Sequence, residues 1–154
     1  MQNFPEFQNE NMGGCQCFCF APFSKLAIMP LAKNALTTDL IFSTGSVWFI
    51  GLAILNTLDF QEETSNSDSG TFYKTKITGL VPSLNIDILI LFNEMKQLRH
   101  LIKIADNNGN TRICGLNGGL KFAFTQDTKK LPAGTSGIEF EFTGENPEPS
   151  PFLI

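Results

Sequence analysis

Strict alternation of apolar and polar residues is the feature that most restricts what this chain can fold into. The stretch GIEFEFTG, Gly137–Gly144, alternates apolar and polar residues: Ile138, Phe140 and Phe142 are apolar, and Glu139, Glu141 and Thr143 between and after them are polar. Side chains of a β-strand point alternately to opposite faces of the sheet. The segment therefore predicts a half-buried strand with its phenylalanines inside and its glutamates outside.

Similar patterns recur along the chain. CQCFCF opens a predicted strand at Cys15–Phe23, with Phe18 and Phe20 on one face, and FYKTKITG predicts another at Phe72–Gly79. Further strands are expected in these segments: Lys25–Pro30, Ile41–Glu62 (one or two strands), His100–Ala105, Arg112–Leu116 and Leu120–Thr125. We therefore expect a mainly β fold, an antiparallel β-sandwich or open barrel of seven or eight strands.

One helix is predicted over residues 83–98, SLNIDILILFNEMKQL, after Pro82. Apolar residues line one face at helical spacing, but the first two turns are apolar on the opposite face as well. That second face consists of Ile86, Leu89, Ile90 and Phe92. In a domain this small, we expect one face to cover the sheet and the other to contact a partner chain. A short apolar run is also compatible with a strand.

The 154 residues suit one domain, 1–154, with an extended N-terminal segment (1–14) and a Pro-rich C-terminal tail (145–154). The polar run EETSNSDSG, Glu62–Gly70, predicts a long loop at the tip of a hairpin. Only 17% of the residues are charged, against about 25% in an ordinary domain. The low charge indicates that part of the surface is covered by other subunits.

The formal net charge of −4 argues against non-specific binding to nucleic acid, because phosphates attract basic surfaces. The N-terminus lacks the basic and apolar regions of a signal peptide, so we expect a cytoplasmic chain without structural disulfides. Leu40–Leu58 is uncharged and approaches the length of a membrane span. It carries polar residues and no basic flank, and two buried strands explain it equally well, so no membrane association is expected.

The cysteines are the main candidates for metal chemistry. Cys15, Cys17 and Cys19 lie about 6.6 to 7 Å apart along a strand, which is poor spacing for one ion. Cys114 could contribute to such a metal site only if its strand lies beside the strand of Cys15, Cys17 and Cys19. Packing as small apolar side chains is the simpler interpretation, with a metal site as the alternative.

No catalytic residue and no cofactor are predicted. His100 is the only histidine, which excludes a two-histidine metal site within one chain and places His100 at the end of the helix. Glu62–Glu63 and Glu139/Glu141 are more simply solvated carboxylates than an acid–base pair. GLNGGL at Gly115–Leu120 lacks the phosphate-loop pattern, and DNNGN at Asp106–Asn110 predicts a tight hairpin rather than a calcium loop.

Several segments resemble small structural proteins of tailed bacteriophages and prophages. They are, in order, YKTKITGLVP, ILILFNEMKQL, HLIKIADNNGNTRICGL, LKFAFTQDT and GIEFEFTGENPEPSPFL. The N-terminal segments APFSKLAIMP and TLDFQEE are similar in the same way. The resemblance covers about two thirds of the chain and rests on the order of elements, without a catalytic signature.

The resemblance implies a non-enzymatic virion subunit, most similar to a tail tube protein that forms stacked hexameric rings. Its partners would be copies of itself, other virion proteins, and DNA that passes through the channel without specific binding. It would be assembled in the bacterial cytoplasm and located in the virion tail. A head–tail connector, a baseplate ring, a capsid decoration protein and a small cysteine-based metal-binding module remain alternatives.

The interpretation as a ring subunit also assigns contact residues. The hairpin loop would contact the next ring, and the termini would connect rings. Together with the second helix face, the expected subunit interface comprises Ile86, Leu89, Ile90, Phe92, Glu62, Glu63, Ser65, Asn66, Asp68, Phe152, Leu153 and Ile154.

Overall fold

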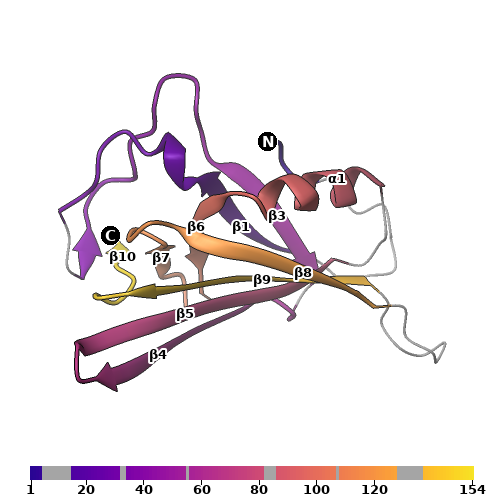
Figure 1. The fold of residues 1–154 in the computed structure, drawn as a ribbon. Coiled ribbons are helices and arrows are strands. Elements are labelled where there is room, and N and C mark those ends of the chain that lie inside the picture. The colour runs from indigo at the N-terminus through magenta and orange to yellow at the C-terminus, as the bar shows by residue number, and fades with distance from the viewer. Residues whose placement is uncertain (5–14, 32–33, 55, 82–85, 107, 128–136) are drawn as a thin grey trace.

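The computed structural model describes residues 1–4, 15–31, 34–54, 56–81, 86–106, 108–127 and 137–154. These residues form ten strands, one α-helix and a short 3₁₀ turn (Figure 1). The elements are β1 (Cys15–Pro22), η1 (Phe23–Lys25), β2 (Ala35–Leu36), β3 (Phe49–Ile54), β4 (Asp59–Ser67), β5 (Gly70–Val81), α1 (Ile86–Met95), β6 (Arg99–Ala105), β7 (Thr111–Cys114), β8 (Leu120–Asp127), β9 (Gly137–Asn146) and β10 (Phe152–Leu153).

All ten strands belong to one sheet that branches at β6. β1 pairs along one edge of β6, and β8 and β7 pair in succession along the other edge. One branch then runs β8-β9-β5-β4, and the other runs β7-β10-β2. The mainly β fold with one packed helix is confirmed, although the described residues hold ten strands rather than seven or eight. The β10–β2 pair is parallel, which makes the sheet mixed.

The sheet curves back on itself like an open barrel. β3 is held in the sheet through β1, yet it also lies close against β5. The backbone N–H of Leu80 in β5 donates to Oγ1 of Thr57, just after β3, at 3.3 Å. A methyl group added at Gly79 would lie 3.2 Å from Cβ of Ala53. β3 and β5, which belong to different branches of the sheet, therefore approach each other around a shared core.

Phenylalanine rings fill that core. α1 lies over the sheet and buries Ile88, Leu91, Phe92 and Met95 (Figure 1). The buried rings come from four elements, β1, α1, β8 and β9, and from the N-terminal segment: Phe4, Phe18, Phe20, Phe92, Phe122, Phe140 and Phe142. The alternation in β9 places Phe140 and Phe142 inside, as predicted.

Phe92 corrects the expected partner-facing surface of the helix. Its side chain is completely buried, and its ring centroid lies 5.0 Å from that of Phe122 and 5.2 Å from that of Phe4. Ile88, Leu91, Phe92 and Met95 occupy positions i, i+3, i+4 and i+7, which together form the face that a helix turns to its own core. Phe92 is thus unavailable to a partner.

A second, smaller core lies on the opposite face of β6 and β7. Leu101 and Ile113 pack there with Leu36 and Leu40, and Phe42 and Trp48 lie alongside. The apolar stretch Leu40–Leu58 therefore supplies this core and β3. Among the described residues, no helix has the length and apolar character needed to cross a membrane. The strand expected at Lys25–Pro30 is reduced to a single bridge between Leu26 and Phe42.

The loop predicted at Glu62–Gly70 is a strand pair. β4 runs to Ser67, β5 begins at Gly70, and the turn between them contains only Asp68 and Ser69. The resulting hairpin projects from the body of the protein (Figure 1). The prediction failed because a ribbon that extends beyond the core can be polar on both faces, so that its pattern matches that of a loop.

His100 does not belong to the helix but to β6, in agreement with the strand predicted at His100–Ala105. Its side chain is fully buried, and its ring lies among those of Phe20, Phe122 and Phe142. Nε2 is 2.8 Å from the carbonyl oxygen of Met95, the last residue of α1, and donates to it in the neutral tautomer. Nδ1 has no hydrogen-bond partner among the described residues. The histidine therefore caps the helix from the neighbouring strand.

Acid is expected to destabilise the fold through His100. Burial lowers the pKa of His100 below its ordinary 6.5, although the hydrogen bond to Met95 acts in the opposite direction. Because the pKa of His100 is lower in the folded state than in the unfolded state, the full contribution of neutral His100 to the free energy of unfolding is present above pH 6.5. As the pH falls from 6.5 to the folded-state pKa, the free energy of unfolding decreases by up to about 1.4 kcal/mol per pH unit. Urea unfolding measured across this range should show a weaker pH dependence for His100→Gln. An identical pH profile for both proteins would exclude His100 as the cause.

Candidate functional site

The outer face of β4, β5, β9 and β8 forms one continuous surface, because these strands pair side by side. Inward residues of these strands, such as Ile77 and Phe142, fill the core, so the alternate residues point outward. These outward residues are mostly charged or hydroxylated. We call this surface the polar face.

Strand register gathers three basic residues of the polar face, Lys76, Lys121 and Arg99, into one line. Gln61 pairs with Lys76, Lys76 with Thr143, Thr143 with Lys121, and Lys121 with Arg99. Residues directly opposite one another in an antiparallel pair share a face. These five residues (the cationic row) therefore cross five strands without a carboxylate.

Carboxylates occupy the positions two residues away along the strands. Asp59 pairs with Thr78, Thr78 with Glu141, and Glu141 with Ala123. Leu80, Glu139 and Thr125 form the line beyond. We call these two lines the acidic rows. The line on the other side of the cationic row is mixed and contains Glu63, Lys74 and Glu145.

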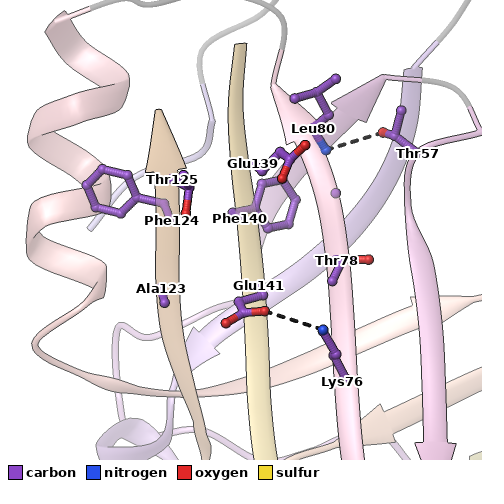
Figure 2. Close-up of a pocket in the computed structure, with 11 residues that line it drawn as sticks. Thr57, Lys76, Thr78, Leu80, Ala123, Phe124, Thr125, Glu139, Phe140 and Glu141 are labelled. Atoms are coloured by element: carbon purple, nitrogen blue, oxygen red, sulfur yellow. Dashed lines mark hydrogen bonds and ion pairs between the residues drawn. The ribbon is translucent and has the colours of Figure 1, made fainter. Parts of the chain in front are cut away.

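Two adjacent hollows follow these rows. The first, about 450 Å³, lies over the acidic rows, and Figure 2 shows Glu139, Glu141, Thr78 and Ala123 around it. The second, about 710 Å³, lies over the cationic row and the mixed line and is bordered by Arg99 and Lys121. Lys76 lines both hollows, and its Nζ is 3.8 Å from Oε2 of Glu141. A hollow rich in cations thus lies directly beside one rich in carboxylates.

The helix residues expected at an interface divide into three groups. Phe92 is core, as described above. Leu89 is partly buried against the core, whereas Ile86 and Ile90 are 71% and 62% exposed. Because Ile86 and Ile90 are one turn apart, they form a small apolar surface on the outside of α1.

The expected hairpin residues point in different directions. Glu63 belongs to the polar face, and Asn66 Oδ1 accepts a hydrogen bond from Thr71 Oγ1 at 2.9 Å. Ser65 lies further along β4, and Asp68 lies in the exposed turn. Glu62 differs from these residues, because its carboxylate accepts hydrogen bonds from elsewhere in the protein.

Glu62 holds the C-terminal tail. Its Oε2 accepts hydrogen bonds from Ser150 Oγ at 2.6 Å, from Ser150 N at 3.1 Å, and from Thr75 Oγ1 at 3.2 Å. Ser150 and Thr75 are both buried. The charge expected to face another ring is therefore committed within the chain.

The tail residues expected at an interface also pack largely on their own chain. Phe152 and Leu153 form β10 between β7 and β2. The guanidinium carbon of Arg112 lies 3.9 Å from the centroid of the Phe152 ring, and Leu153 packs on the second core. Ile154 is 83% exposed and remains accessible.

The cysteines do not converge. Cys17 is exposed and Cys19 half-buried on the outer face of β1, whereas Cys114 lies in the main core on the opposite face. The side chain of Cys15 lies outside the described part of the chain. Within the described part, no three His, Cys, Asp or Glu side chains are grouped to hold a metal ion. Burial raises the pKa of the Cys114 thiol to about 12, and burial also raises the pKa of Cys19.

Comparison with known proteins finds no matching family model, no similar curated protein and no similar solved structure. The site is therefore interpreted from its own residues. The cationic row had no linear signal, because Lys76, Arg99 and Lys121 are scattered in the sequence and meet only through strand register.

Proposed function

We propose that this protein is a non-enzymatic virion subunit that assembles with copies of itself into the rings of a phage tail tube. The observation that carries the proposal is the exposed pair Ile86 and Ile90 on α1. Two large aliphatic side chains one turn apart, on a helix whose other face is already buried, favour a protein partner over water.

The exposed edge of the sheet supports the same proposal. β4 ends one branch of the sheet, and its outer edge has no strand partner in the described part of the chain. A nine-residue edge exposes backbone N–H and C=O groups that a neighbouring chain can pair with. The β4–β5 hairpin projects from the body, so a neighbour can reach it without deforming the core (Figure 1). Contacts between different patches on successive copies generate rings when the rotation closes.

The net charge of −4 fits the second part of the proposal, passage of DNA through a central channel. A surface dominated by carboxylates repels phosphates, so DNA would slide past without binding. Other virion proteins would contact the first and last rings.

Ile90→Asp is expected to abolish assembly while the monomer remains folded. A carboxylate in the apolar contact would remain buried without a partner in the assembly, whereas in the free monomer it faces water. Negative-stain electron microscopy of the wild type should show rings or tubes with a central channel, and Ile90→Asp should show isolated particles with an unchanged circular dichroism spectrum.

Phe92→Asp is the matched control on the same helix. Its side chain is fully buried, so this variant should lose the fold itself, seen as loss of the cooperative thermal transition. Rings formed by Ile90→Asp as readily as by the wild type would remove α1 from the interface. A wild type that remains monomeric at high concentration would contradict the proposed function.

A further inference from the structure

We infer that the polar face binds the same face of a second copy of this chain, related by a two-fold axis that runs parallel to the cationic row. The inference rests on the proposed self-assembly and adds to it a contact between identical faces, distinct from the contacts between different patches that close a ring. It follows from three observations: two opposed cations, Arg99 and Lys121, without an ion pair in the described part of the chain, a neighbouring group of carboxylates, and the sizes of the side chains between them.

The cationic row carries an unfavourable charge arrangement within the monomer. Arg99 and Lys121 are directly opposite each other on paired strands, and like charges in this position are destabilising. Neither side chain has an ion pair with a carboxylate in the described part of the chain. Local arrangements that oppose stability are expected mainly at functional sites. An anionic partner over this row would remove the repulsion.

The flanking carboxylates restrict the form of that partner. Acidic rows lie on one side of the cationic row, and Glu63 and Glu145 lie on the other. A duplex or an extended nucleic acid laid across the face would meet these carboxylates as well as the cations. A single carboxylate side chain of a partner protein can contact the cationic row without approaching the flanking carboxylates. The acidic rows of a second copy present such carboxylates at the required spacing.

A two-fold axis between the cationic row and the first acidic row makes the two faces complementary. Neighbouring rows are about 6.6 to 7 Å apart along the strands. Rotation about this axis places each strand over the same strand of the second copy and exchanges the two rows. Glu141 of the second copy then lies over Thr143, between Lys76 and Lys121. The same contact forms twice, because the operation is symmetric.

Side-chain sizes match this arrangement. Lys76 lies over Thr78 of the second copy, and Lys121 lies over Ala123 of the second copy, so each long side chain faces a short one. Glu141 in turn faces the small side chain of Thr143. The hollow over the acidic rows, in which Thr78 and Ala123 are visible in Figure 2, provides the space for the two lysines. Charge and shape therefore agree in the same register.

Charge exchange between two variants tests the contact directly. The first variant is Lys76→Glu with Lys121→Glu, and the second is Glu141→Lys. In each variant alone, Glu141 or its replacement would face like charges in both copies. In a mixture of the two variants, every contact regains opposite charges. Each variant should therefore bind itself about tenfold or more weakly than the wild type does, and a one-to-one mixture should restore wild-type association.

The measurement is sedimentation equilibrium, with all proteins also carrying Ile90→Asp so that ring assembly through α1 does not interfere. Lys96→Glu serves as the control, because Lys96 is exposed and lies outside the polar face. Thermal unfolding verifies that each variant is folded. High salt should weaken the association of the protein that carries Ile90→Asp alone, since screening acts on exposed charge pairs. This salt test requires no substitution in the face.

Restored association in the mixture would support the inference. Two results would overturn it. In the first, the charge variants dimerise as well as the protein that carries Ile90→Asp alone. In the second, the protein that carries Ile90→Asp alone remains monomeric. These results are distinguishable from failure of the proposed function. Rings in the absence of a charge-dependent dimer would retain the function and remove this contact. A charge-dependent dimer without rings would retain the contact and remove the tail tube.

Discussion

Phe18→Ala is expected to lower the free energy of unfolding by about 3 to 5 kcal/mol. Phe18 lies at the centre of the main core and is 2% exposed. Its ring packs against those of Phe4, Phe140 and Phe142 at centroid distances of 5.6 to 5.9 Å. Truncation removes these contacts and leaves a cavity bordered by rigid rings, which cannot collapse to fill it. Equilibrium unfolding in urea measures the loss.

Gly51 makes this prediction sharper. Gly51 faces Phe18 across the β1–β3 pair, and a methyl group added there would lie 2.2 Å from the tip of the Phe18 ring. Gly51→Ala alone should cost about 1 to 3 kcal/mol through overpacking. In the double variant the added methyl group enters the space that Phe18 leaves, so the two losses should sum to more than the measured loss. Strictly additive losses in the two single variants and the double variant would show that the Phe18 ring does not pack against Gly51.

Glu62→Ala is expected to cost roughly 2 to 4 kcal/mol and to release the C-terminal tail. The substitution removes the acceptor of three hydrogen bonds and leaves the hydroxyl groups of Ser150 and Thr75 buried without it. An unsatisfied buried donor is costly, so the tail should separate from β7 and expose the neighbouring Cys114. Maleimide labelling resolved by peptide mass spectrometry should show faster modification of Cys114.

Glu63→Ala is the matched control for this substitution. It removes the same charge one residue further along β4, on the exposed polar face, where no buried donor depends on it. Its stability should lie within about 0.5 kcal/mol of the wild type, and labelling of Cys114 should be unchanged. Equal effects of the two substitutions would mean that net charge, rather than the contact with Ser150, determines stability.

The strands with one solvent-exposed face could be predicted from the sequence, because burial of the other face makes apolar and polar residues alternate. β9 shows this most clearly: Phe140 and Phe142 lie inside, as their spacing requires. The same physics fails in the β4–β5 hairpin, where neither face of the outer part meets the core. It fails again at Phe92, because an apolar residue within an apolar run does not indicate which side of the helix it occupies.

The candidate site was not predictable for a different reason. Lys76, Lys121 and Arg99 acquire their relationship from pairing between β5, β9, β8 and β6, and a shift of one residue in any pair would separate them. The role of Glu62 was also hidden, because Ser150 is 88 residues away in the sequence. The low share of charged residues predicted a partner surface without indicating its position, and only tertiary structure brings the candidate residues together.

The position of β10 between β7 and β2 has a consequence for the rate of folding. Among the described residues, residues 35–36 join the sheet only through residues 152–153, which are 117 residues further along the 154-residue chain. Closing so long a loop is entropically unfavourable until the intervening strands are already paired. Contacts of this range slow the folding of β proteins to milliseconds or seconds. We therefore expect docking of β2 to be the last step of refolding and the first to reverse, with fluorescence of nearby Trp48 as its natural reporter.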